Sequence, residues 1–162
     1  MKRIIRTAAI AVILLLLPFM ANAKGTRMLS DLSKLPDVES VYISQAAFRL
    51  TGNADIMGMD PSVLKNIRSM EILETSNATS RQAMEKKAGE LMERLGLEVL
   101  VEAKDKEDIT VVYGKVPEAD SGNGLVESVL ILTGDSKEST LIFIDGKINI
   151  NDITNAVNKK EK

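Results

Sequence analysis

The chain contains no cysteine and no histidine. The missing cysteines exclude disulfides, so stability must come from packing alone. The two absences together remove most zinc and haem sites and most nucleophile–base pairs. What remains for chemistry is serine with lysine, paired carboxylates and the thioethers of methionine.

The first 23 residues have the three parts of an export signal. A basic region is followed by an apolar stretch over residues 8–17 and by Ala21-Asn22-Ala23, a small-x-small cleavage pattern. The apolar stretch is shorter than the roughly 20 residues that cross a bilayer, which favours cleavage over anchoring. We expect a cleavable leader over residues 1–23 and a single domain over residues 24–162. The mature chain would then be periplasmic or secreted, without a membrane span.

Size and charge narrow the class of the mature protein. Removal of the leader leaves 139 residues (162 − 23), a length that suits one domain with one core. The leader takes three of the 21 basic residues and none of the 23 acidic ones, so the mature chain carries a net charge of −5 (18 − 23). This sign argues against nucleic acid as a partner, because phosphates require a basic surface.

Apolar spacing and turn residues divide the first half of the mature chain into short elements. Apolar residues at helical spacing predict an amphipathic helix over residues 28–35, which Pro36 ends. The elements expected after it are a strand over residues 37–44, one or two helical turns over 45–50, an irregular segment over 52–61, a brief helix from Pro61 through Ile67 and a strand over 69–75.

The strongest helical pattern runs from about Ala78 to Leu95. Its apolar residues fall on one stripe, while charged residues occupy the other faces. Asn77 or Thr79 can cap its start, and Gly96 stands where a helix ends. We expect this helix to cover a sheet.

Four apolar runs follow, "LEVLVEA", "ITVVYGKV", "LVESVLILT" and "STLIFIDG". The polar links between them are too short for a crossover helix, so the runs should pair as an antiparallel meander. Glu98 and Glu102 are expected on one face of their strand, with Leu97, Val99 and Val101 on the other. The predicted fold class is α+β, with a meander sheet of about five or six strands and helices packed on one face.

The stretch "LIFIDGKININD" invites a calcium-loop interpretation. Counting Asp145 as the first ligand puts Ile150 at the position that requires glycine and Ala156 at the position that requires glutamate. The pattern therefore favours a turn at Asp145-Gly146, followed by a last helix capped by Asn149 or Asn151. We predict no metal site and no cofactor.

Several segments together resemble a known family. A leucine-rich opening, "VESVYISQAAFRL", a long helix ending in "LMERLGLEVL" and a meander closing in "LIFIDGKININD" are similar to the exported domain-of-unknown-function family DUF4252 of Bacteroidetes-type bacteria. The resemblance covers essentially the whole mature chain. It implies an α+β domain in the periplasm or cell envelope, and it supplies no activity, cofactor or catalytic residue.

One pair of residues has the spacing of a catalytic motif. Ser62 and Lys65 form a Ser-x-x-Lys pattern, which puts a nucleophile and its base on one helical face in exported penicillin-recognising enzymes. No Lys-Thr-Gly follows, and the chain is too short for the two-part fold of those enzymes. A small Ser/Lys hydrolase is therefore an alternative rather than the expected function.

The segment over residues 52–61 holds the candidate contact residues. Met57 and Met59 could both turn their thioethers toward Cu(I), with Asp60 beside them, although methionine more often fills a core. Glu71 and Glu74 lie an odd number of residues apart on a predicted strand, so they should point to opposite faces and form no catalytic pair. The leading hypothesis is a non-catalytic module that binds an unknown envelope protein or ligand, through this segment, the open sheet face or a strand edge.

Overall fold

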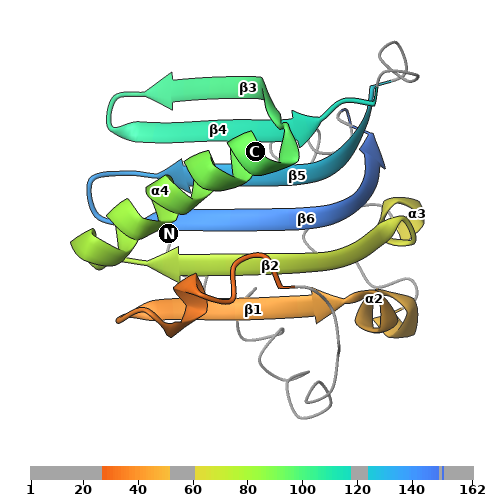
Figure 1. Cartoon of the computed structure of the whole chain (residues 1–162), viewed down its shortest axis with the longest axis horizontal. Coiled ribbons are helices and arrows are strands. Elements are labelled where there is room, and N and C mark those ends of the chain that lie inside the picture. The colour runs from red at the N-terminus through yellow and green to blue at the C-terminus, as the bar shows by residue number, and fades with distance from the viewer. Residues whose placement is uncertain (1–26, 52–60, 118–123, 150, 152–162) are drawn as a thin grey trace.

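The computed structural model describes residues 27–51, 61–117, 124–149 and 151. These residues build one six-stranded antiparallel sheet with the strand order β1-β2-β6-β5-β4-β3 (Figure 1). The strands are β1 (Val38–Ser44), β2 (Ile67–Thr75), β3 (Glu98–Asp105), β4 (Asp108–Lys115), β5 (Leu125–Gly134) and β6 (Ser139–Asn149). The predicted α+β class and the meander from β3 to β6 are confirmed.

Helix α4 (Ala78–Leu95) crosses one face of the sheet (Figure 1). The Asn77 side chain accepts hydrogen bonds from the Thr79 and Ser80 amides at 3.0 and 3.1 Å, which satisfies two amides of the first turn. Gly96 ends the helix in the left-handed conformation, with φ 63°. The apolar stripe of α4 packs on the inward side chains of three central strands, in a cluster that contains Met84, Ala88, Leu91, Leu73, Leu130, Leu141 and Phe143.

Two short helices lie against the opposite face. They are α2 (Gln45–Thr51) and α3 (Pro61–Leu64), and Phe48 and Leu64 share a second core cluster with Met70 of β2. Met70 and Leu73 lie an odd number of residues apart on β2, so the two clusters occupy opposite faces. The expectation that helices pack on one face therefore holds for α4, whereas α2 and α3 cover part of the opposite face, here called the second face. Helix α3 ends before the expected Ile67, because Ile67 already pairs with Gly146 in the sheet.

Residues 27–37, the N-terminal arm, run along the α4 face beside β1 and β2. The amphipathic α-helix expected over residues 28–35 is instead a turn followed by the 3₁₀ helix η2 (Leu32–Lys34). The Leu32 amide bonds to the Leu29 carbonyl and the Leu35 amide to the Leu32 carbonyl, both over three residues. The apolar spacing still has its predicted effect, since Leu29 and Leu32 are buried in the α4-face cluster.

A bulge in β3 changes the predicted faces of its side chains. Leu100 is inserted between the pairs Val99–Tyr113 and Val101–Val112. Glu98 consequently lies opposite Gly114 and Glu102 opposite Val111, and these two β4 residues point to different faces. The expectation that Glu98 and Glu102 share one face is therefore wrong.

The dipeptide Asp145-Gly146 lies inside β6 and does not form the turn expected from its sequence. Gly146 is required because the backbone of Asn66 and Ile67 approaches it closely; an added Cβ would stand 2.8 Å from the Ile67 Cα. The Lys147 amide donates to the Asn66 carbonyl at 3.2 Å. At the end of β6 the Asn149 side chain accepts from the Asn151 amide at 3.0 Å. The last helix predicted after it lies outside the described residues.

Candidate functional site

The residues predicted to carry chemistry lie at or beyond the limits of the described chain. Met57, Met59 and Asp60 fall outside the described residues. Ser62 belongs to α3, which ends at Leu64, and Lys65 follows in the next turn with an exposed side chain. Ser62 and Lys65 therefore do not lie within one described helix.

The acidic side chains of the described residues are not grouped as a metal centre requires. Among the described residues, no three His, Cys, Asp or Glu side chains gather closely enough to hold an ion. Glu71 pairs with Tyr42 and Glu74 with Glu39 on the neighbouring strand β1. Glu71 and Glu74 thus point to opposite faces of β2, as predicted, and form no carboxylate pair.

The two edge strands of the sheet differ in how well they are protected. β3 carries the bulge at Leu100 and four charged residues along eight positions (Glu98, Glu102, Lys104 and Asp105). Bulges and charges are the features by which natural sheets prevent further strands from adding. β1 pairs with β2 through all seven of its residues without a register shift, and it contains a single charge, Glu39. β1 is therefore the edge suited to accept another strand.

Both faces of β1 continue the side-chain rows of the sheet. On the second face, Val41 lies beside Ile72 of β2, and this row continues through Ile142 of β6 and Ile131 of β5. All four side chains are half-buried. On the α4 face, Ser40 is exposed and Tyr42 is half-buried. An added strand would thus meet an apolar row on one face and polar or aromatic side chains on the other.

Side-chain hydrogen bonds hold β1 in place at both ends. Before the strand, the Thr75 hydroxyl donates to the Asp37 carbonyl at 2.6 Å, and the Ser80 hydroxyl donates to the Pro36 carbonyl at 2.8 Å. After the strand, the Ser44 hydroxyl accepts from the Ala47 amide at 3.4 Å, where α2 begins. These bonds reduce the freedom that β1 would lose on binding, which favours recognition by a preformed edge.

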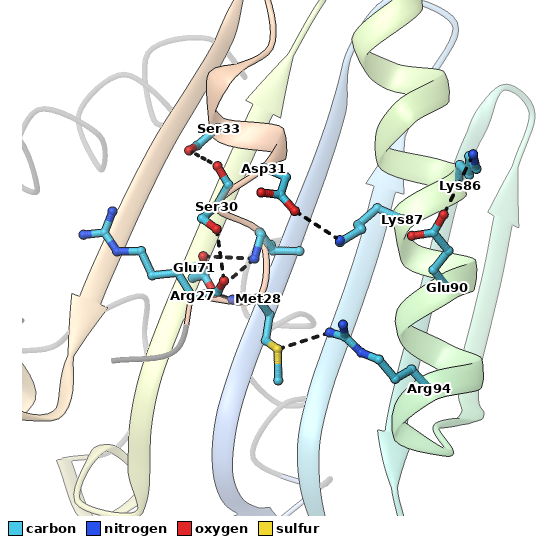
Figure 2. A network of polar contacts seen from close by, with 11 residues as sticks. Arg27, Met28, Ser30, Asp31, Ser33, Glu71, Lys86, Lys87, Glu90 and Arg94 are labelled. Carbon is cyan, nitrogen blue, oxygen red and sulfur yellow. Dashed lines mark hydrogen bonds and ion pairs between the residues drawn. The ribbon is translucent and has the colours of Figure 1, made fainter. Parts of the chain in front are cut away.

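A buried carboxylate anchors the N-terminal arm next to β1 (Figure 2). Glu71 is 5% exposed, and its side chain accepts the Met28 amide at 2.5 Å and the Leu29 amide at 3.2 and 3.3 Å. Burial raises the pKa of Glu71, while the Met28 and Leu29 amides and the charge of Arg27 oppose that rise. The Arg27 guanidinium lies 4.3 Å from the centre of the Tyr42 ring, a cation–π contact on β1 itself.

Further contacts connect the arm to α4 (Figure 2). The Lys87 ammonium lies 3.8 Å from the Asp31 carboxylate, and the Arg94 guanidinium lies 3.3 Å from the Met28 sulfur. The arm is therefore attached both to the sheet, through Glu71, and to the helix above it. Together these contacts cover the α4 face of the sheet beside β1. Among the described residues, no strand pairs with the edge of β1 that faces away from β2.

The role of Glu71 was missed by sequence reasoning, which considered this residue only as half of a carboxylate pair. A signal was present, since Glu71 stands between Met70 and Ile72 and shares its face with Leu73. A carboxylate on an apolar face of a central strand must be hydrogen-bonded when buried. The identity of its donors, two backbone amides about 40 residues earlier in the chain, depends on the fold.

Residues 32–156 match the family described as Domain of unknown function (DUF4252). The chain belongs to the DUF4252 family. The match covers residues 32–37 of the arm, all six strands and the helices of this DUF4252 protein, in agreement with the resemblance of its sequence segments. No curated protein and no solved structure matches the chain. Within the part of the chain that the structure describes, no helix combines the length and apolar character needed to cross a membrane.

Proposed function

We propose that this DUF4252 protein is an exported, non-catalytic binding protein that receives an extended segment of an envelope partner along β1. The observation that carries the proposal is the contrast between the two sheet edges. β3 is bulged and charged, whereas β1 is straight and has one charge in seven residues. An edge of the second kind is open to pairing with another chain unless a strand, helix or loop covers it.

Strand addition explains how such an edge would bind. The outward amides and carbonyls of β1 would form main-chain hydrogen bonds, which supply affinity with little dependence on sequence. Alternate side chains would supply specificity. A partner segment with β-branched or other apolar residues at every second position would extend the row that begins at Val41, and small or aromatic residues at the other positions would suit Ser40 and Tyr42.

The proposed site lies outside the inner membrane, in the periplasm or beyond it. The leader over residues 1–23 supports export, and the acidic mature chain supports a protein or small ligand over nucleic acid. The segment that contains Met57, Met59 and Asp60 connects α2 to α3, and α2 follows β1 directly. These three residues lie outside the described residues, and we include them as proposed partner contacts on the evidence of their sequence alone.

A photo-crosslinking experiment tests the proposal. A photoreactive amino acid replaces Ser40, which is exposed on β1, and in a matched variant it replaces Ala103, which is exposed on β3. Both variants are expressed in a bacterium that makes the protein, and crosslinked peptides from the envelope are sequenced. We expect position 40 to capture one recurring partner through an extended apolar segment and position 103 to capture none. Equal capture from both positions, or none from position 40, would contradict the proposal.

A further inference from the structure

We propose that the segment received by β1 is the β1 strand of a second copy of this chain, paired antiparallel about a twofold axis at Tyr42. This inference rests on the proposed function, because it requires β1 to accept a strand. It adds the identity of the partner and the register of pairing. The resulting dimer would contain one continuous sheet with the two β1 strands at its centre.

Symmetry limits the possible registers. A twofold axis perpendicular to the sheet keeps α4 of both copies on the same side of the sheet. Two residues that pair across the axis must therefore have their side chains on the same side of the sheet. Side chains alternate between faces along a strand, so only residues of equal parity can pair. One residue then faces its own copy on the axis. For the seven-residue strand β1, the central choices are Ser40, Val41 and Tyr42.

Side-chain chemistry selects among these three registers. With Val41 on the axis, the Glu39 carboxylate would face Ile43 of the second copy, an apolar side chain of the core. With Ser40 on the axis, Glu39 would face Val41 of the second copy. With Tyr42 on the axis, Val41 of each copy pairs with Ile43 of the other, and the two Tyr42 residues pair with each other. Apolar side chains then lie beside apolar ones and aromatic rings beside aromatic rings. Such cross-strand pairs each contribute about 0.2–1 kcal/mol relative to alanine pairs.

Among the described residues, the two elements that flank β1 do not meet in this pairing. In the Tyr42 register, the last residues of β1 run beside Ser40 of the second copy, where α2 of the first copy approaches the arm of the second. These two elements lie on opposite faces of the sheet, since Phe48 of α2 packs in the second-face cluster and Leu29 of the arm packs in the α4-face cluster. The second β1 strand would also extend the row of half-buried side chains that now ends at Val41.

The charges near the axis are balanced within each copy. Arg27 lies over the Tyr42 ring, and Glu71 lies opposite Tyr42 on β2. Each copy therefore brings one basic and one acidic side chain close to the axis on the α4 face. Glu39 lies on the second face and beyond the five residues, 40–44, that this register pairs.

The absence of cysteine makes a background-free test possible. The molar mass of the mature protein is measured by light scattering after size-exclusion chromatography. In a second experiment, the single-cysteine variants Tyr42→Cys and Ser40→Cys are oxidised separately. We expect a mass of two chains and a disulfide-linked dimer with Tyr42→Cys, because paired Cα atoms stand about 4.5–5.5 Å apart. Ser40→Cys should not crosslink to itself, because four residues of offset separate the two sites by about 13 Å. Ala103→Cys on β3 is the control and should remain unlinked.

A second variant tests the interface without a disulfide. Ser40 is exposed, so Ser40→Lys should fold normally while placing a charge on the edge that blocks pairing. We expect the dimer dissociation constant to rise at least tenfold, whereas Ala103→Lys on β3 should leave it unchanged. A monomeric wild-type chain, a crosslink through Ser40→Cys or Ala103→Cys, or an unchanged dissociation constant for Ser40→Lys would overturn the inference.

The outcomes also separate this inference from the proposed function. If the mature chain is monomeric but the photoreactive group at position 40 captures an envelope protein, the partner is a different chain and the β1 site stands. If position 40 captures nothing and Tyr42→Cys stays unlinked, both proposals fail.

Discussion

Replacement of Glu71 by alanine would test whether one buried carboxylate holds the N-terminal arm on the sheet. Glu71 accepts the amides of Met28 and Leu29, and Leu29 is fully buried. In Glu71→Ala the Leu29 amide would lose its acceptor in a place that water does not reach, which costs about 1–3 kcal/mol. The half-buried Met28 amide can turn to water at a smaller cost.

A second effect acts in the opposite direction. The variant no longer has to desolvate a carboxylate, and that relief offsets part of the loss. We therefore expect the free energy of unfolding at pH 7 to fall by about 1–2 kcal/mol, since the loss of an acceptor for a buried amide outweighs the relief. Urea denaturation followed by circular dichroism measures this change. Glu85→Ala is the matched control, because Glu85 is exposed on α4, and it should change stability by less than about 0.5 kcal/mol.

Amide hydrogen exchange gives the local readout for the same variant. If Glu71 anchors the arm, the Leu29 amide should exchange much faster in Glu71→Ala, while amides in the middle of β6 keep their protection. An unchanged exchange rate at Leu29, with a normal fold, would refute the reasoning. In that case the arm would be held by the burial of Leu29 and Leu32 alone.

Three further outcomes are expected. Burial raises the pKa of Glu71 in the folded state, so the folded protein binds that proton more tightly than the unfolded chain. The unfolding free energy of wild type, relative to that of Glu71→Gln, should therefore rise as the pH falls from 7 to about 4.5 and stay constant below that pH. A difference that does not change with pH in urea denaturation would contradict this. In urea denaturation, Gly146→Ala should lower the free energy of unfolding by about 1–3 kcal/mol, because its Cβ would meet the backbone of Asn66 and Ile67. Gly89→Ala in α4 should raise the free energy of unfolding by about 0.5–1 kcal/mol, because its Cβ would meet no other atom. The double variant Met57→Ala, Met59→Ala should keep the wild-type melting temperature and weaken partner capture from position 40; an unfolded variant would assign both side chains to the core.

Local sequence signals were sufficient for the elements whose interactions are local. Helix α4 was predicted to its ends, because its cap at Asn77, its left-handed Gly96 and its apolar stripe all act within a few residues of the chain. The meander from β3 to β6 was predictable for the same reason, since short polar links leave neighbouring strands no partner but each other. The opposite orientations of Glu71 and Glu74 followed from the alternation of a strand.

Tertiary structure decided the features that depend on segments far apart in the chain. The sequence could not show that the backbone of Asn66 and Ile67 lies close to Gly146. Asp145-Gly146, a dipeptide typical of turns, was therefore predicted to form a turn although it lies inside β6. Nor could it show the bulge at Leu100, which reverses the face of Glu98 and makes β3 a protected edge. The candidate site has the same origin: β1 is an open edge only because β6 returns to pair with β2 on its other side. Composition and local spacing determined which segments are strands and helices, whereas long-range pairing alone determined which strand is left without a neighbour.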